Sequence, residues 1–139
     1  MHLIIDTQTH ELQPHEHARL THPAVCGIIL FARHYQSLDQ LKKYIDTIKN
    51  IRSDLLITID QEGGRVQRIR EPLTRIPPMA TLGETYDKNP QKALALATEY
   101  GYTISHELKQ LGIDINFAPI LDLGHPESRV IVILLPSRP

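Results

Sequence analysis

The sequence has few of the residues and runs that mark several large classes of protein. It holds a single cysteine, Cys26, so no intrachain disulfide can form. The sequence has fifteen Lys and Arg residues and sixteen Asp and Glu residues. The resulting net charge of −1 gives no electrostatic basis for binding nucleic acid or an anionic membrane. No apolar run approaches the ~18 residues of a transmembrane helix. We therefore expect no nucleic-acid partner, no membrane association, and a buried Cys26 thiol in a reducing cytoplasm.

Motifs for metals, cofactors and secretion are missing as well. The eight histidines are scattered, with no pair at helical i, i+4 spacing and no Cys/His cluster. Neither Gly-x-Gly-x-x-Gly nor the Gly-Lys-Ser/Thr of a P-loop occurs. Residues 1–6 carry no basic segment and the chain soon turns polar, so we expect no secretory signal. The expectation is a protein without metal or cofactor.

Apolar runs alternate with amphipathic stretches, which predicts βα units and a parallel sheet. We expect strands at residues 3–6, 25–31, 55–60 and 113–118, and helices at 14–20, 37–52 and 90–111. Ser37 and Gln40 have the spacing of a capping box, and Asn89 before Pro90 is a good helix start. The apolar residues of the last helix, Ala93 and Leu94 among them, fall on one side, and Gly112 ends it. The proline-rich stretch 70–89 predicts a long ordered loop.

Residues 59–68 form the most informative segment: Ile-Asp-Gln-Glu-Gly-Gly-Arg-Val-Gln-Arg. It follows a continuous apolar run typical of a buried parallel strand, and α/β folds build their sites at the C-terminal ends of such strands. The Gly63–Gly64 pair permits a positive φ or a close approach of the backbone to a ligand. The carboxylates and arginines of the segment would then converge on a polyhydroxylated or anionic ligand, or pair with one another in a turn.

This segment resembles the signature of glycoside hydrolase family 3, most of all that of bacterial β-N-acetylhexosaminidases that recycle cell-wall sugars. Three further stretches fit in the family's order. They are Cys-Gly-Ile-Ile-Leu-Phe-Ala-Arg-His-Tyr (26–35), Thr-Arg-Ile-Pro-Pro-Met-Ala (74–80) and Leu-Gly-Ile-Asp-Ile-Asn-Phe-Ala-Pro-Ile-Leu-Asp-Leu (111–123). The resemblance implies a (β/α)₈ barrel and a retaining hydrolysis in which an aspartate attacks the anomeric carbon and a histidine serves as acid and base.

The chain is too short for a whole barrel, which takes ~250 residues. We expect a partial (β/α)₈ TIM-type barrel of roughly the first four β/α units, with residues 1–131 as the N-terminal part of the family's barrel domain. Residues 132–139 form a divergent tail, in which Val132 and Leu134 stand where the family's Val-Ile-Gly-x-Arg has glycine and arginine. We hypothesise a frameshift, because the codons for Gly-Asp (GGN GAY) can read as Val-Ile, the residues at 132 and 133, when one G is lost. Exposed barrel edges would allow self-association.

The resemblance assigns two residues to substrate binding, Asp60 and Arg68, which match family positions that hold the sugar. A carboxylate accepts hydrogen bonds from two sugar hydroxyls, and a guanidinium offers a rigid fork of donors. Pairing with each other or with backbone amides is the favoured interpretation of Glu62 and Arg65. No catalytic residue is expected, because the family's Lys-His-Phe-Pro-Gly-His-Gly segment, its Asp-Ser-His loop with the acid/base histidine and its nucleophilic aspartate are absent from the sequence.

Three other residues at predicted strand ends are candidates for the site. Asp122 follows the fourth strand and would face the same edge of the sheet, but a structural hydrogen bond is at least as good an explanation. For Arg33 and His34, which end the second strand, a buried ion pair or a buried hydrogen bond is favoured over ligand contact.

Three functions remain open on the sequence. The first is the N-terminal portion of a β-N-acetylhexosaminidase acting on terminal N-acetylglucosamine of cell-wall fragments or muropeptides, inactive by itself. The second is a non-catalytic remnant of a truncated or frameshifted gene. The third and weakest is a phosphate-binding βα module, because a Gly pair after a strand can cradle an anion.

Overall fold

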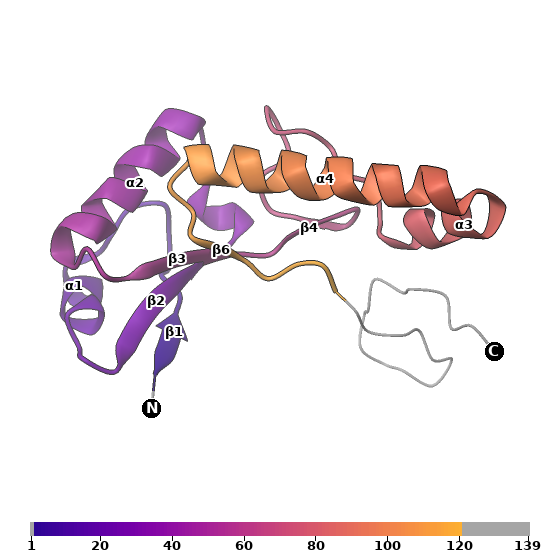
Figure 1. The fold of residues 1–139 in the computed structure, drawn as a ribbon. Coiled ribbons are helices and arrows are strands. Elements are labelled where there is room, and N and C mark those ends of the chain that lie inside the picture. Colours follow the sequence, from indigo (N-terminus) through magenta and orange to yellow (C-terminus); the bar gives the residue numbers. More distant parts are fainter. Residues whose placement is uncertain (1, 121–139) are drawn as a thin grey trace. The chain divides into compact units, whose positions relative to one another are not determined.

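The computed structural model describes residues 2–120, and these fall into two compact units (Figure 1). Of the described residues, the first unit comprises 2–60 and 107–116, and the second comprises 61–106 and 117–120. The predicted tail, residues 132–139, and Asp122 lie outside the described residues. Each unit is described below by itself.

A four-stranded parallel sheet forms the centre of the first unit. Its strands are β1 (Leu3–Ile5), β2 (Val25–Leu30), β3 (Leu56–Ile59) and β6 (Ile115–Asn116), in the order β1-β2-β3-β6. All three pairings are parallel, as the sequence predicts. The observed strands are shorter than predicted, by one residue in β1 and β2 and by four in β6. Because parallel strands share a direction, the residues after β1, β2 and β3 meet at one edge of the sheet.

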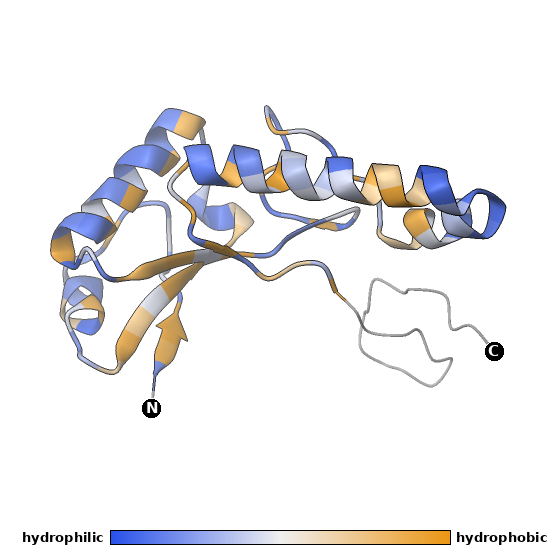
Figure 2. Ribbon diagram, viewed as in Figure 1, coloured by the Kyte–Doolittle hydropathy of each residue, from blue (hydrophilic) through white to orange (hydrophobic). Residues whose placement is uncertain are grey.

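Two helices, α1 (Pro14–Leu20) and α2 (Leu38–Ile51), lie along one face of this sheet (Figure 1). The pairing register places Ile28 with Ile57 and Leu30 with Ile59 on the helix-covered face, and all four side chains are at most 1% exposed. Leu41, Tyr44, Ile45 and Ile48 of α2 are buried too. The strands are apolar along most of their length, whereas α2 alternates between polar and apolar residues (Figure 2). This alternation is the amphipathic pattern that predicts the helix.

The capping box predicted at the start of α2 is only half formed. Ser37 Oγ accepts a hydrogen bond from Gln40 N (3.2 Å), as expected of an N-cap. Gln40 Oε1, however, accepts from the N–H of Gln36 (3.0 Å) instead of returning to Ser37. Its amide nitrogen donates to the carbonyls of His10 (3.0 Å) and His34 (3.2 Å), so this side chain fixes the loops that precede both helices of the layer.

Asp114 closes the opposite edge of the sheet, before β6. One of its carboxylate oxygens accepts hydrogen bonds from Lys49 Nζ and from the buried N–H of Ile57, both at 2.8 Å. Burial by itself would raise the pKa of Asp114, but the bonds from Lys49 and Ile57 outweigh it, and the pKa lies below its usual value. Gly112, with φ of +81°, ends the preceding helix as predicted.

The second unit holds a short antiparallel hairpin, β4 (Gln61–Gly63) with β5 (Val66–Gln67), and the helix α3 (Ala80–Lys88). The long helix α4 (Pro90–Gln110) begins here and ends in the first unit. Its predicted start is confirmed by a hydrogen bond from Lys92 N to Asn89 Oδ1 (3.0 Å). One expectation is wrong: residues 70–89 are not a loop throughout, because α3 occupies residues 80–88. On α4, Ala93 is buried whereas Leu94 is 61% exposed, so the apolar side of this helix is buried only in part.

Within residues 2–120, none of the helices is both long and apolar enough to cross a membrane.

Candidate functional site

The end of β3 places Asp60 at the C-terminal edge of the parallel sheet. Two neighbouring strands deliver other polar groups to the same edge: Asp6 and Thr7 follow β1, and a short 3₁₀ turn with Arg33 and His34 follows β2. Crevices outside the carboxyl ends of parallel strands are where α/β folds bind ligands. The sheet therefore presents Asp60, a predicted sugar ligand, at an edge suited to a site.

Arg33 and His34 both hold this edge together. The guanidinium of Arg33 pairs with Asp6, donates to the carbonyl of Thr7 from Nη2 (3.1 Å) and lies 4.6 Å from the centre of the Phe31 ring. The ion pair is wrongly predicted as buried, since the Arg33 and Asp6 side chains are 42% and 51% exposed. For His34, which is fully buried, the predicted hydrogen bond is confirmed.

The contacts of His34 define its protonation. Its Nδ1 accepts from the N–H of Phe31 (2.9 Å), so Nε2 carries the proton and donates to the carbonyl of Thr7 (2.8 Å). The ring stacks on Tyr44, whose hydroxyl bonds with Thr7 Oγ1 and whose pKa is raised by burial to about 12. Burial, with a smaller effect from Arg33, holds the pKa of His34 below its usual 6.5. We therefore assign a neutral imidazole that ties β1 to β2.

This arrangement predicts that the free energy of unfolding decreases in acid. Above pH 6.5, His34 is neutral in both the folded and the unfolded state; below it the unfolded chain takes up a proton that the folded chain resists. Stability is thus lost as the pH falls from 6.5 toward the lower folded pKa. Urea unfolding at pH 7.5 and pH 5.5 measures the effect. In His34→Gln, which keeps a donor for Thr7, we expect a smaller difference between the two pH values; an unchanged difference would contradict this role.

The Gly pair of the signature serves packing within the second unit. Gly63 and Gly64 have φ of +93° and +56°, the left-handed region that glycine adopts without strain. A Cβ on Gly63 would lie 2.8 Å from the carbonyl oxygen of Pro77, and one on Gly64 would lie 2.8 Å from Pro78. The N–H of Gly64 donates to the carbonyl of Ile76 (2.7 Å). This amide is therefore engaged by the chain itself, which weighs against the anion-cradle hypothesis.

Two buried glutamines of the signature, Gln61 and Gln67, hold the segment that follows it. Gln61 donates to the carbonyl of Ile69 (2.6 Å) and accepts from its N–H (3.1 Å). Gln67 donates to the carbonyl of Thr74 (2.8 Å) and accepts from the N–H of Ile76 (3.1 Å). Sequence reasoning concentrated on the charged residues and missed these two. Their signal was an uncharged amide at each end of the hairpin, able to donate and accept at once.

A matched pair of glycine substitutions tests the packing role. Gly63→Ala should lower the free energy of unfolding by ~1–3 kcal/mol, because alanine strains at positive φ and contacts Pro77. Gly101→Ala, in the middle of α4 with nothing within 4 Å of the added Cβ, should raise it by ~0.5–1 kcal/mol. Urea unfolding followed by circular dichroism gives both values. Equal stability of the two variants would show that the close approach of Pro77 is unimportant.

The other residues of the signature occupy different environments. Arg68 directly follows β5 and is half-buried; Glu62 is buried within β4, and Arg65 is exposed at the hairpin turn. Arg68 belongs to the second unit and Asp60 to the first. That both bind one sugar therefore stays a prediction. Among residues 2–120, no group of three or more His, Cys, Asp or Glu side chains is placed to hold a metal ion.

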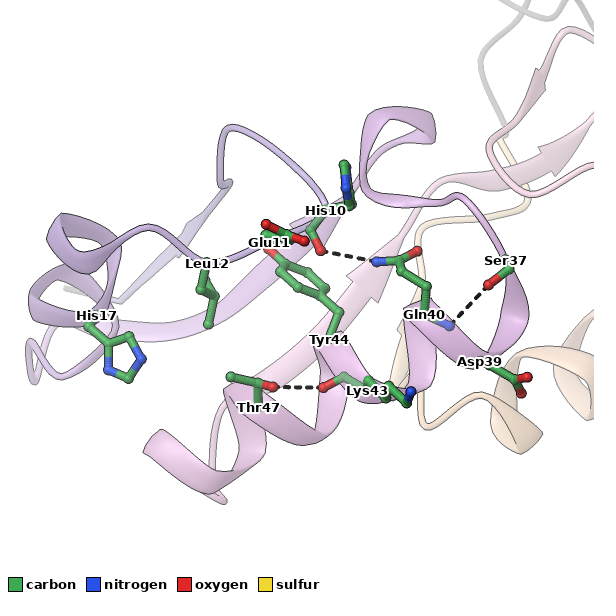
Figure 3. Close-up of a pocket in the computed structure, with 10 residues that line it drawn as sticks. All are labelled: His10, Glu11, Leu12, His17, Ser37, Asp39, Gln40, Lys43, Tyr44 and Thr47. Carbon is green, nitrogen blue, oxygen red and sulfur yellow. Dashed lines mark hydrogen bonds between the residues drawn. The ribbon is translucent and has the colours of Figure 1, made fainter.

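A hollow of about 520 Å³ lies between α2 and the loop after β1 (Figure 3). Tyr44 and Lys43 of α2 line it from one side and His10 and Glu11 from the other, and the bond from Gln40 to the carbonyl of His10 spans it. Neither Asp60 nor Arg68 is among its lining residues. The hollow is thus separate from the predicted sugar ligands, in the helical layer outside the sheet.

Comparison with known proteins decides the family. The sequence profile of the Glycosyl hydrolase family 3 N terminal domain matches residues 4–132. The chain belongs to this family. The parallel sheet with its outer helices is accordingly part of a (β/α)₈ barrel, as predicted, and the signature around Asp60 is that of the family.

Relatives in this family are much longer than the chain. It is 48% identical over 130 residues to a beta-hexosaminidase of Nitrosomonas eutropha, covering 93% of this chain but 37% of the relative. NagZ from Neisseria gonorrhoeae, solved in complex with N-trifluoroacetyl-D-glucosamine, is similar in structure, with a TM-score of 0.83 and 41% sequence identity. The match covers 87% of this chain and 36% of NagZ. A β-N-acetylglucosaminidase of Paenibacillus gives a TM-score of 0.74 and 35% sequence identity, and the match covers 86% of this chain and 23% of that protein. The chain spans little more than a third of the length of the beta-hexosaminidase and of NagZ.

Proposed function

We propose that this chain is the N-terminal, sugar-binding portion of a retaining β-N-acetylhexosaminidase that removes terminal N-acetylglucosamine from cell-wall fragments in the cytoplasm. The observation that supports it most is the place of Asp60, which opens the family signature at the C-terminal end of β3. The relatives support the substrate class, because one is a beta-hexosaminidase and another was solved with a glucosamine derivative. The lone Cys26, half-buried and unable to form an intrachain disulfide, agrees with a reducing compartment.

In this proposal the residues of the chain bind and orient the sugar and carry out no covalent step. Asp60 accepts hydrogen bonds from two adjacent hydroxyls, and Arg68 donates to the same sugar once the barrel is complete. The bonds of Arg33 and His34 to Thr7 fix the ends of β1 and β2, next to the strand that carries Asp60. The buried glutamines fix the hairpin that carries Arg68.

A chimera tests this function directly. Residues 1–120 of this chain replace the aligned segment of the Nitrosomonas eutropha beta-hexosaminidase, which keeps its own remaining two thirds. The folded chimera should hydrolyse a chromogenic N-acetyl-β-glucosaminide and should not act on the matching β-glucoside. A chimera that is folded by circular dichroism and inactive on both would contradict the proposal. It would favour the second candidate, a remnant that has lost the ability to support catalysis.

A further inference from the structure

Both chain neighbours of Arg68 are buried and bonded within the second unit. Gln67 and Ile69 are 3% and 1% exposed. The backbone of Gln67 pairs with that of Gln61 in the hairpin. Ile69 lies beyond β5, yet its N–H donates to Gln61 Oε1 (3.1 Å) and its carbonyl accepts from Gln61 Nε2 (2.6 Å). The same carbonyl accepts from Gln67 Nε2 (3.2 Å). The backbone is therefore fixed immediately before and after Arg68.

The side chain of Gln61 takes the place of a strand partner. If the hairpin continued past the pair of Gln61 and Gln67, the next residues to face each other would be Ile59 and Ile69. Ile59 instead belongs to β3 of the parallel sheet. A side-chain amide carries both a donor and an acceptor, as a peptide group does. Gln61 thus extends the bonding of the hairpin as far as Ile69, past Arg68.

A fixed backbone matters most for a long side chain that must bind a ligand. Arginine loses rotamer freedom when it binds, and any freedom of its backbone adds to that cost. A displacement of about 1 Å at a binding group can lower catalysis up to ~100-fold. Both polar atoms of the Gln61 side chain bond to Ile69, the residue directly after Arg68. The bonds are therefore placed to limit movement of the arginine.

We propose that Gln61 is a positioning residue that acts through Ile69 to hold Arg68 in place for the sugar. The inference rests on the proposed function, in which Arg68 donates to the substrate, and it identifies the side chain that sets the place of that arginine. Gln61 acts without touching the sugar. Its contribution to catalysis should therefore exist only while Arg68 is present.

Hydrogen exchange on the 139-residue chain tests the bonds themselves. Gln61→Met keeps a similar volume and removes both bonds to Ile69, so the amide of Ile69 should exchange at least about tenfold faster. The amide of Gly64, which donates to the carbonyl of Ile76 in the same hairpin region, should change by less than about threefold. Gln61→Glu keeps an acceptor for Ile69 but not the donor, and it replaces the methionine variant if that one does not fold. An unchanged Ile69 amide, or equal acceleration of both amides, would overturn the proposal.

A double-mutant cycle in the chimera separates positioning from general stability. Gln61→Met should lower kcat/KM about tenfold and should change the same parameter, KM or kcat, as Arg68→Ala. In the Arg68→Ala background, the same substitution should change kcat/KM by less than about twofold. Asn89→Ala is the matched control, because it removes the cap of α4 in the same unit. It should lower the melting temperature but leave kcat/KM within about twofold of the parent.

The cycle also distinguishes failure of this proposal from failure of the proposed function. Equal losses from Gln61→Met with and without Arg68 would show that Gln61 contributes to stability alone, and only the positioning role would be overturned. An inactive chimera, or one that keeps full activity after Arg68→Ala, would contradict the sugar-binding role of Arg68. The positioning role of Gln61 would then be wrong as well.

Discussion

Substitution of Asp60 by alanine in the active chimera should lower kcat/KM about 100- to 1,000-fold, which is ~3–4 kcal/mol at 1.36 kcal/mol per tenfold. Asp60 closes β3 at the edge where the strands deliver their polar residues, and the carboxylate is expected to accept from two sugar hydroxyls. Removal of a charged acceptor would leave those donors unpaired, which costs more than the bond itself contributes. Steady-state kinetics on a chromogenic N-acetyl-β-glucosaminide measure the loss.

Two companion variants show whether the loss belongs to sugar binding. Asp46→Ala removes a carboxylate from the exposed face of α2 and should leave kcat/KM within about twofold of the parent, since exposed charges contribute little. Asp60→Asn keeps one acceptor oxygen but no charge, so its activity should fall between those of the parent and the alanine variant. If Asp60→Ala retained full activity, the role that the family resemblance assigns to this residue would be wrong.

The sheet was predictable because its signal is local and apolar. Continuous runs such as residues 55–60 form strands in which alternate side chains, here Ile57 and Ile59, are buried on the face covered by helices. The spacing of Leu41, Ile45 and Ile48 matches the buried stripe of α2. The starts and ends of helices were predicted well for the same reason. Ser37, Asn89 and Gly112 each act through bonds or dihedrals within a few residues of themselves.

The hairpin and its support were not predictable from such patterns. Gln61, Glu62 and Gln67 are polar but buried, which reverses the usual relation between polarity and exposure. Burial of the two glutamines is possible because each bonds to backbone groups of residues 69–76. These bonds depend on how the chain folds back after the hairpin, which the spacing of residues in the sequence does not indicate. Pro77 and Pro78 favour a loop, so the sequence does not indicate the helix α3 that begins two residues after Pro78.

For the site, the sequence indicated which residues to consider but not what they contact. The place of Arg33 and His34 at a strand end favours structural roles, and the structure adds their partners, Asp6, Thr7 and Phe31. None of these partners follows a periodic pattern, because Asp6 and Thr7 follow β1 and Phe31 follows β2, two segments that parallel pairing brings together. Tertiary hydrogen bonds of this kind explain why a resemblance names residues more reliably than it describes their geometry.

The isolated 139-residue chain should show no measurable hydrolysis of a chromogenic N-acetyl-β-glucosaminide. Departure of the aglycone needs a proton donor, and the anomeric carbon needs a nucleophile. The resemblance places both groups in segments whose sequences do not occur among these 139 residues. Positioning of a sugar by Asp60 and Arg68 does not replace them.

The assay uses purified chain at high concentration, with substrate in excess and the active chimera as the positive reference. The Asp60→Ala variant of the isolated chain, prepared in the same way, reports any contaminating glycosidase from the expression host. Activity present equally in both preparations comes from the host. Turnover that disappears only in the variant would mean that Asp60 and its neighbours suffice for hydrolysis. The proposal that this chain binds the sugar but carries out no covalent step would then be wrong.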